Sequence, residues 1–377
     1  MGLNDSTEAF PETTSRAVRW VAIVVLPLLL LLVAALAAEA LVRARQWSKN
    51  GTLGSYSDLY VTDNSIGLRL LRPSMQFGNV HVNSAGFRGP ELITPKPVDD
   101  VRIAFLGAST TFAAEPSSDD AEVWPDLVVQ KLRRRFPKTR FDYINGGVPG
   151  HTLSSTRKLL QARILALQPD IIVIFPGTND LVGELMDLAV AQGLARPHDA
   201  SSESWIARKS LLWELVAKNL RVISARQAAR SGSQGLKFDP SELGKQFGPN
   251  LVALLKEASA DAQRVAIATF PTQLRSHQSR ERQLSAAVSA FVYMPFMSAN
   301  GLIAAYANHN QLIEQAALAQ GALLIGNEEA FPADPDHFVD TVHFANKGNQ
   351  VMASRVADAL ASDPRVVDLI QSRRRNE

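Results

Sequence analysis

The distribution of apolar and polar residues divides the chain into three parts. The first contains an uncharged apolar run from Trp20 to Ala38. The second, residues 50–98, is rich in Gly, Pro, Asn and Ser and has short alternating pieces typical of strands and turns. From Val101 onward, short apolar runs alternate with amphipathic stretches. The pattern therefore predicts a helix of membrane length, a strand-and-turn segment and a large α/β domain.

Strands and helices alternate in the predicted α/β domain. Buried strands are expected at residues 102–107, 141–146, 169–177, 264–271 and 322–327. Amphipathic helices are expected at residues 122–136, 154–167, 302–319 and 347–361. Such successive units imply parallel strands joined by helical crossovers. The segment at about residues 183–262 is too long for an ordinary connection, and we expect a helical insertion over one end of the sheet.

The apolar run near the N-terminus predicts one membrane span. Its 19 residues reach roughly 28 Å as a helix, about the thickness of a bilayer core. A cleaved signal peptide is the alternative, because the sequence "LAAEA" offers small residues at a suitable spacing, although the run is long for a signal peptide. The basic residues on either side slightly favour a cytoplasmic C-terminal domain.

The amino-acid composition disfavours some binding partners and excludes some kinds of catalytic or metal site. The chain has 377 residues, of which 46% are hydrophobic and 20% charged, as is ordinary for a globular protein. Its 39 basic and 37 acidic residues leave a net charge of +2, which does not favour a nucleic-acid partner. The chain has no cysteine, so disulfides, thiolate metal sites and a cysteine nucleophile are excluded.

Residues that suit acyl transfer follow the predicted strands. Ser109 follows the first strand in "FLGAST", Gly150 the second in "NGGVPGHT", and Asn179 the third in "PGTND". Asp340 and His343 precede the last helix in "DTVHFANKG". Ligands of open α/β sheets bind beyond the carboxyl ends of the strands, so these segments are expected to converge there.

Together, these residue types can form a nucleophilic site. A serine hydroxyl needs a base, here His343, and the imidazole needs an acceptor that orients it, here Asp340. The backbone amides of Ser109 and Gly150 and the side-chain amide of Asn179 can donate to an oxyanion. Taken singly, each residue has an ordinary explanation. A serine often caps a helix, an Asn-Asp sequence often forms a turn, and an Asp and a His often form a hydrogen-bonded pair on the surface.

In order, the blocks "FLGASTT", "INGGVPGHT", "FPGTNDL" and "DTVHFANKGN" resemble the four motif blocks of the SGNH/GDSL hydrolase family. The resemblance covers roughly residues 101–361. It implies a flavodoxin-like three-layer α/β/α fold, a catalytic triad of Ser109, His343 and Asp340, an oxyanion hole of the Ser109 amide, Gly150 and Asn179, and no metal or other cofactor. The segment "VNSAGFRGPE" also resembles the lead-in of membrane-anchored bacterial members.

Two departures from the family pattern concern the site. Ala108 stands where the family has the aspartate of its G-D-S block, and we expect altered local packing without loss of activity. "DPDH" offers a second D-x-x-H pair, Asp334 and His337; we prefer Asp340 and His343 because a glycine and the final helix follow them, as in the family. Asp180 and His151 are expected to be structural neighbours of the site.

The predicted function is a serine esterase acting on an acyl ester, with acetyl as a candidate, of a cell-envelope glycan or lipid. An O-acyltransferase of the same fold and a non-catalytic membrane-anchored scaffold remain alternatives. An α/β-hydrolase is less favoured because its G-x-S-x-G motif is absent: Thr111 stands at the position of the second glycine. A nucleotide-binding module is also less favoured, because G-x-G-x-x-G is absent.

The resemblance and the anchor together favour a single-pass membrane protein with a periplasmic or other extracytoplasmic catalytic domain, against the charge count. The substrate and the oligomeric state stay open. The expected organisation is a polar tail at 1–19, a transmembrane anchor at 20–42, a lead-in segment at 43–98, a hydrolase domain at 99–363 with its insertion at about 183–262, and a charged C-terminal tail at 364–377.

Overall fold

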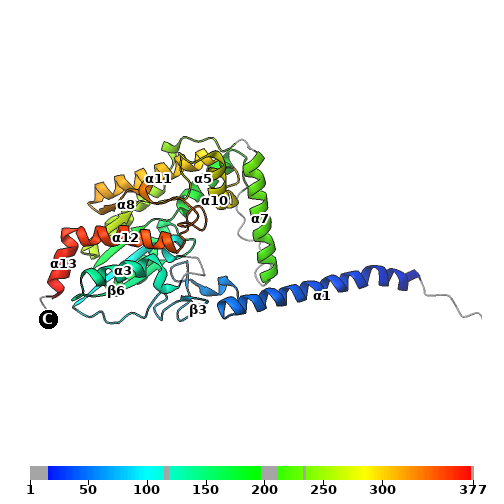
Figure 1. Cartoon of the computed structure of the whole chain (residues 1–377), viewed down its shortest axis with the longest axis horizontal. Helices are drawn as coiled ribbons and strands as arrows, with labels where there is room; N and C mark the ends of the chain where they lie inside the picture. Colours follow the sequence, from blue (N-terminus) through cyan, green and yellow to red (C-terminus); the bar gives the residue numbers. More distant parts are fainter. Residues whose placement is uncertain (1–15, 114–118, 197–209, 232–234, 375–377) are drawn as a thin grey trace, which may run out of the picture.

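The computed structural model describes residues 16–113, 119–196, 210–231 and 235–374. Figure 1 shows an α/β domain with helices on both faces of a central sheet, and a long N-terminal helix, α1 (Arg16–Asn50), that extends away from it. The C-terminus lies at the opposite end of the domain from α1.

A five-stranded sheet forms the centre of the domain. Every neighbouring pair of strands is parallel, and the order across the sheet is β6-β5-β7-β8-β9. This is the flavodoxin-like order, so the predicted fold class is confirmed. The strands are β5 (Asp100–Gly107), β6 (Arg140–Gly147), β7 (Ile171–Phe175), β8 (Arg264–Ala268) and β9 (Leu323–Ile325).

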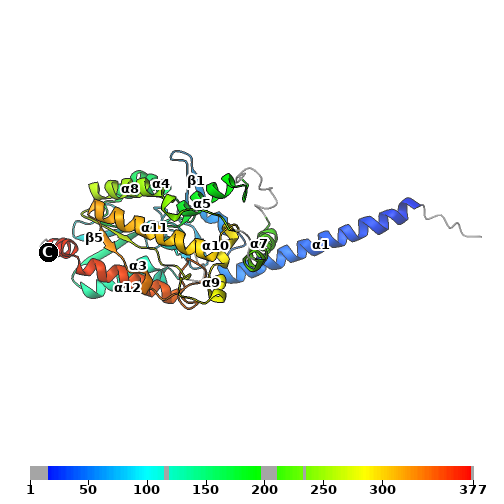
Figure 2. The same cartoon turned by 90° about the horizontal axis from the view of Figure 1, so that it is seen from above.

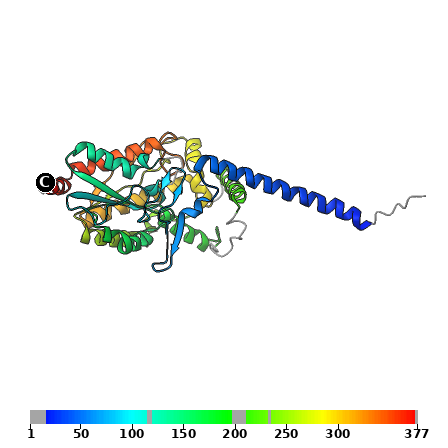
Figure 3. The same cartoon turned by 90° about the horizontal axis from the view of Figure 1, so that it is seen from below.

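Helices cover both faces of this sheet, as Figures 1 and 3 show. One face carries α3 (Trp124–Arg135) and α12 (Asn346–Ser362), which pack against each other. The other carries α4 (Leu153–Leu159), α8 (Phe247–Asp261) and α11 (Ala299–Gln320). After Leu159 the chain of α4 continues through a π turn and a 3-10 turn to Leu167. Because both faces are covered, every residue of β5 and β7 is buried, which explains the apolar run along the whole of β7 and along residues 103–106 of β5.

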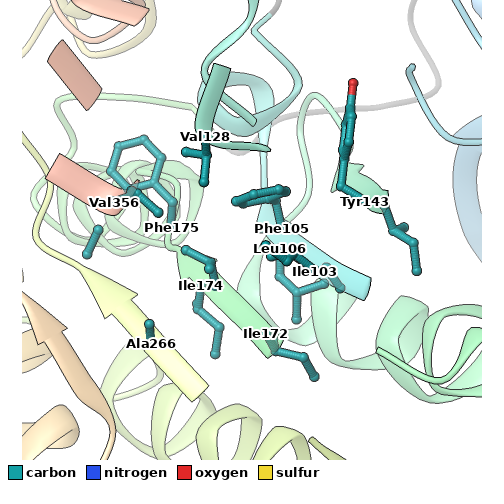
Figure 4. Close-up of a cluster of buried hydrophobic side chains, with 14 of the residues drawn as sticks. Ile103, Phe105, Leu106, Val128, Tyr143, Ile172, Ile174, Phe175, Ala266 and Val356 are labelled. Atoms are coloured by element: carbon teal, nitrogen blue, oxygen red, sulfur yellow. The ribbon is translucent and has the colours of Figure 1, made fainter. Parts of the chain in front are cut away.

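The main core lies between the sheet and these helices. Figure 4 shows side chains of β5 and β7 packed with residues of α3 and α12, among them Phe105, Phe175, Val128 and Val356. The ring of Trp124 meets Phe105 edge-on at a centroid distance of 5.1 Å. Each such fully buried side chain contributes roughly 1.5–3 kcal/mol to folding, so this core holds the carboxyl ends of β5 and β7 in place.

A second, smaller core lies over the carboxyl ends of the strands. It includes residues of α5 (Asn179–Ala191), α9 (Arg280–Ala286), α10 (Val288–Tyr293) and the N-terminal half of α11. Helix α7 (Leu211–Ser231) packs against α10. The segment expected as an insertion thus contains two kinds of helix, since α8 belongs to the outer layer of the sheet and α7 lies outside the three layers.

The lead-in segment consists of short strands and turns that share the main core. A 3-10 turn at Tyr56–Leu59 precedes two antiparallel pairs. Leu59, Leu71 and Phe77 are buried in the same cluster as the central sheet. The strands are β1 (Tyr60–Asp63), β2 (Leu68–Leu71), β3 (Gln76–Phe77) and β4 (Val80–His81). Further 3-10 turns lie at Asp120–Glu122, Pro240–Glu242 and Glu328–Ala330.

Two expected boundaries differ from the structure. Helix α1 extends past residue 42 to Asn50, because residues 43–50 contain no helix breaker and Gly51, with a φ of +65°, supplies the left-handed residue that ends it. The expected tail at 364–377 is helical as α13 (Pro364–Arg374), because Val366, Leu369 and Ile370 share a helical face and are buried. Residues 1–15 of the expected polar tail, and residues 375–377, lie outside the described residues.

Candidate active site

The site begins where β5 ends. The strand stops at Gly107, and the short helix α2 (Ser109–Phe112) starts two residues later, so Ser109 stands at the carboxyl edge of the sheet. Its side chain is partly exposed, whereas Thr110, Thr111 and Phe112 are buried. A Cβ at Gly147 of β6 would lie 2.3 Å from the backbone nitrogen of Phe112, so the close approach of β6 to this turn requires glycine.

The structure brings Ser109, His343 and Asp340 into one hydrogen-bonded chain. The Nε2 atom of His343 lies 2.9 Å from the Oγ of Ser109, across 234 residues of sequence. Its Nδ1 atom lies 2.8 Å from Oδ2 of Asp340. Both distances are within the range of a good hydrogen bond. The three residues predicted to act together therefore have the geometry of a nucleophile, a base and an orienting carboxylate.

Asp340 is held in place by the backbone around it. Its Oδ1 accepts hydrogen bonds from the amides of Val342 and His343, both at 2.8 Å. Burial alone would raise the pKa of Asp340, but the hydrogen bonds from the His343 ring and these amides hold the pKa below its ordinary value. The carboxylate is therefore ionised at neutral pH, and an ionised carboxylate only accepts hydrogen bonds. It follows that Nδ1 of His343 carries the proton, and Nε2 presents its lone pair to the Ser109 hydroxyl.

The loop that carries Asp340 and His343 is attached to its surroundings at two points. The buried Thr341 donates from Oγ1 to the carbonyl of Ala286 at 2.6 Å, and its amide donates to Oγ of Ser289 at 3.0 Å. Phe344 stacks on Phe331, with a centroid distance of 5.0 Å, and on Phe175 at the end of β7. These contacts join the loop to α9, α10 and the sheet.

The second D-x-x-H pair has the same local geometry, but no serine of the described residues is hydrogen-bonded to its imidazole. Nδ1 of His337 lies 2.8 Å from Oδ1 of Asp334, and the amide of His337 donates to the same carboxylate. Sequence spacing alone does not separate this pair from Asp340 and His343. The position of Ser109 does, because its Oγ is 2.9 Å from the His343 ring.

Asn179 and Gly150 lie after the two neighbouring strands, as expected. Asn179 is the first residue of α5, and its Nδ2 donates to the carbonyl of His151 at 2.8 Å. A carboxamide has a second hydrogen, which this bond leaves available. Gly150 is exposed, with a φ of +87°, and a Cβ there would meet nothing within 4 Å, so the glycine answers to its backbone conformation and not to a close neighbour.

Ala108 packs against the turn that carries Asn179. A Cβ at Gly177 would lie 2.6 Å from the Cβ of Ala108 and 3.8 Å from Nδ2 of Asn179. Gly177 is therefore a neighbour both of the side-chain amide of Asn179 and of the residue that precedes Ser109. This contact explains why glycine precedes Thr178 in "PGTND", and it shows the packing role of the alanine that stands in place of the family's aspartate.

Asp180 and His151 support this edge of the sheet. Oδ2 of Asp180 accepts the amide of Leu153, the first residue of α4, at 3.0 Å. Burial raises the pKa of Asp180 to about 6. Nε2 of His151 lies 2.8 Å from the carbonyl of Arg69 in the lead-in segment, and burial lowers the pKa of this imidazole.

Sequence reasoning did not assign a role to Arg88, which lies in the lead-in motif "VNSAGFRGPE". Its side chain is fully buried, and Nε donates to Oδ1 of Asp120 at 2.7 Å. Its Nη1 donates to the carbonyls of Phe112 and Ala113 at 2.9 and 2.6 Å. Arg88 thus holds the C-terminal end of α2, the helix that begins with Ser109. The only signal in the sequence was its place in that motif.

A cavity of about 1000 Å³ adjoins the site from behind the carboxylate. Phe338, Asp340 and Thr341 line it on one side, and α7, α9 and α10 contribute most of the rest of its wall. Ser109 and His343 are not among the described residues that line this cavity, so it borders the candidate site without containing the nucleophile. Within the described part of the chain, no three His, Asp or Glu side chains gather as metal ligands would.

A doubly wound parallel sheet with a serine and a histidine paired at its carboxyl edge defines the class of serine hydrolases built on an α/β/α sandwich. Residues 105–351 match the model of the GDSL-like lipase/acylhydrolase family. The match covers well over half of the chain, and the chain belongs to this family. It is therefore an enzyme of the serine ester hydrolase type.

Solved structures with a similar arrangement include esterases. Acetylxylan esterase Axe2 from Geobacillus stearothermophilus is 13% identical, with 71% of this chain and 98% of that one covered and a TM-score of 0.42. LAE5, an α/β hydrolase from the metagenome of Lake Arreo, Spain, is 17% identical, with 69% and 94% covered and a TM-score of 0.41. The acetyl xylan esterase AlAXEase is 14% identical, with 69% and 99% covered and a TM-score of 0.39. No curated protein matches the sequence.

Helix α1 is the one described helix that is long and apolar enough to cross a membrane. The qualifying stretch is Ile23–Asn50, and none of its most apolar window is buried in the protein. The apolar side chains from Ile23 to Leu26 and from Leu28 to Val33 are all exposed. A helix with such a surface either enters a bilayer or belongs to a signal sequence.

Proposed function

We propose that this enzyme is a membrane-anchored esterase that removes an acyl group, with acetyl as the simplest candidate, from an ester of a cell-envelope glycan or lipid. Ser109 is the nucleophile, His343 the general base and Asp340 its orienting carboxylate. The observation that carries the proposal is the distance of 2.9 Å between Ser109 Oγ and His343 Nε2, with Asp340 2.8 Å from the other ring nitrogen.

The first half of the reaction is acylation of Ser109. His343 accepts the hydroxyl proton at Nε2 while Oγ attacks the ester carbonyl. The imidazolium that forms is stabilised by Asp340 through Nδ1. When the tetrahedral intermediate collapses, the bond between the carbonyl carbon and the alcohol oxygen breaks, and His343 returns the proton to the departing alcohol. The products are the free alcohol and an acyl ester on Ser109.

The negative charge on the tetrahedral intermediate needs donors already in place. In the proposed mechanism these are the amides of Ser109 and Gly150 and the second hydrogen on Nδ2 of Asn179. The contact of the Asn179 amide with the carbonyl of His151, at 2.8 Å, fixes the plane of that amide. Each such donor contributes about 3 kcal/mol to stabilisation of the transition state in related sites.

The second half is hydrolysis of the acyl-enzyme. A water molecule loses a proton to Nε2 of His343 and attacks the same carbonyl, and the proton then passes to Oγ of Ser109 as the carboxylic acid leaves. The same residues act in both halves. The partly exposed positions of Ser109 and His343 leave access for water.

Anchoring by α1 is part of the proposal, as is an extracytoplasmic catalytic domain. The exposed apolar surface of α1 supports a span, and the family resemblance of the lead-in supports the side. An alkaline phosphatase reporter fused to the C-terminus tests the side, because it is active only outside the cytoplasm. An inactive fusion, with the chain still in the membrane fraction, would reverse the orientation.

The catalytic assignment is tested with the full chain in detergent micelles and an activated short-chain aryl ester. Ser109→Ala is expected to abolish turnover and labelling by a fluorophosphonate probe, which reacts with activated serines. Ser154→Ala, at an exposed serine of the neighbouring helix α4, is the matched control and should leave both unchanged. Labelling that persists in Ser109→Ala would assign the nucleophile to another residue.

A further inference from the structure

Helix α7 carries an exposed apolar stripe. Trp213, Val216, Leu220 and Ile223 are between 41% and 60% exposed. Their spacing of three, four and three residues places them on one face of the helix, along about three turns. Isolated apolar side chains on a surface are ordinary, but a continuous stripe that includes a tryptophan marks an interaction surface.

The opposite face of α7 turns toward the hydrolase domain across an open cavity, so its Glu214, Lys218 and Arg221 are themselves exposed. Glu214, Lys218, Arg221 and Val222 line the cavity behind Asp340, and α7 packs against α10. At 100° per residue, these positions lie on the other side of the helix from the stripe. The stripe therefore points away from the hydrolase domain, and α7 separates it from the cavity.

The start of α7 is attached to the last part of the apolar helix α1. Glu39 follows directly after the apolar run that ends at Ala38. Its carboxylate accepts hydrogen bonds from Ser210 Oγ at 2.8 Å and from the amides of Leu211 and Leu212 at 3.1 and 2.9 Å. These are the first amides of α7, so Glu39 caps that helix. With the apolar run in a bilayer core, this junction lies at the boundary between hydrocarbon and water.

From that junction α7 runs across the direction of α1. In Figure 1 α1 is seen from the side and α7 stands upright beside it, while in Figure 2 α7 is seen nearly end-on. An apolar helix that spans a bilayer lies roughly along the membrane normal. A helix that crosses it at the boundary then lies roughly in the plane of the membrane surface.

We propose that α7 is an interfacial helix that docks the hydrolase domain on the surface of the phospholipid bilayer entered by α1. The stripe of Trp213, Val216, Leu220 and Ile223 is then inserted among headgroups and the upper part of the acyl chains. A tryptophan close to the boundary suits this depth, since its ring prefers the interface. The bilayer is favoured over a protein partner because the stripe begins where the apolar surface of α1 ends.

Docking would place the cavity of about 1000 Å³ directly behind the membrane-bound helix. Lys218 and Arg221 of α7 line it together with Asp340. The candidate active site is then presented to esters at the membrane surface, and substrates far from the membrane are disfavoured. This inference rests on the proposed anchoring by α1, but not on the proposed catalytic residues.

The test uses the absence of cysteine from the chain. Single cysteines are introduced at Leu29 in α1, at Leu220 in the stripe, and at Leu318, an 87% exposed leucine of α11 that serves as a matched control. The C-terminal end of α11, where Leu318 lies, is on the side of the domain away from α1 (Figure 2). Each full-length variant is labelled with an environment-sensitive fluorophore and reconstituted in vesicles of phosphatidylcholine and phosphatidylglycerol.

Lipids with a nitroxide near the headgroup or near the middle of the bilayer then quench the labels by depth. We expect deep quenching at Leu29, shallow quenching at Leu220 and none above background at Leu318. Quenching at Leu29 without quenching at Leu220 would overturn the docking of α7 while anchoring stands. No quenching at Leu29 would overturn the anchor and the docking together. A melting temperature within a few degrees of the unlabelled chain identifies variants that have kept their fold.

Discussion

Replacement of Asp340 by asparagine tests the proposed proton path without a change of side-chain size. In the structure, Oδ1 of Asp340 accepts two backbone amides, and Oδ2 faces Nδ1 of His343 at 2.8 Å. Asparagine keeps its oxygen on the two amides and therefore presents its NH₂ group to the imidazole. The ring then carries its proton on Nε2, the atom 2.9 Å from Ser109 Oγ, and can no longer accept the hydroxyl proton.

The expected loss is large because the base is lost, although the geometry remains. Forcing the wrong tautomer in a Ser-His-Asp triad lowers kcat by about 10⁴-fold, which corresponds to about 5 kcal/mol in the activation barrier. The loss in kcat is measured by steady-state hydrolysis of an activated aryl ester by the full chain in detergent. The melting temperature of Asp340→Asn should stay close to that of the wild type, since the two backbone hydrogen bonds are kept.

Asp334→Asn is the matched control. Asp334 pairs with Nδ1 of His337 at 2.8 Å and also accepts the amide of His337, so the local chemistry is the same. Within the part of the chain that the structure describes, no serine is hydrogen-bonded to His337, and kcat is expected to change by no more than about twofold. The reasoning would be refuted if Asp340→Asn kept more than about a tenth of wild-type kcat, or if both variants lost activity equally.

Three further outcomes are expected. Gly177→Ala should lower kcat by about tenfold or more, because the new Cβ would lie 2.6 Å from the Cβ of Ala108. Adding Ala108→Gly in the same chain should restore kcat, and a double variant that stays slow would contradict the packing argument. Arg88→Gln should lower the free energy of unfolding by about 3 kcal/mol, because it leaves the Asp120 carboxylate without its buried cation. An unchanged midpoint of denaturant unfolding would contradict this role of Arg88. In the folded protein the pKa of Asp180 is about 6, above its unfolded value, so ionisation of Asp180 costs stability as the pH rises between the two values. Asp180→Asn removes this cost, and it should leave the free energy of unfolding unchanged near pH 4 and raise it by at most about 3 kcal/mol near pH 7. A difference that does not depend on pH would contradict this.

The sheet was predictable because its central strands are buried on both faces. β7 and residues 103–106 of β5 have no polar face, so each appears in the sequence as an unbroken apolar run. Asp100 and Arg102, at the start of β5, are buried in ion pairs with Arg140 and Asp142. The residues that follow such strands necessarily meet at one edge of a parallel sheet. That geometric rule made Ser109, Gly150 and Asn179 candidates before any contact was known.

Other features depend on contacts between distant segments, and sequence patterns do not report these. The choice between Asp340 and Asp334 is an example, because the two D-x-x-H pairs have the same spacing and nearly the same local hydrogen bonds. The buried position of Arg88 depends on Asp120 and on the end of α2. The α13 helix was missed because charged residues around Val366 and Ile370 hid its buried face.

The attachment of the lead-in segment has a consequence for how the protein can be divided. The family match begins at residue 105, yet the buried guanidinium of Arg88 holds the turn that carries Ser109. Leu59, Leu71 and Phe77 belong to the same core as the sheet. The part of the chain that shares one core is therefore longer than the part that matches the family model. A truncation at residue 99 would remove segments that hold the catalytic residues in place. A soluble form of this enzyme should begin close to Gly51, where α1 ends.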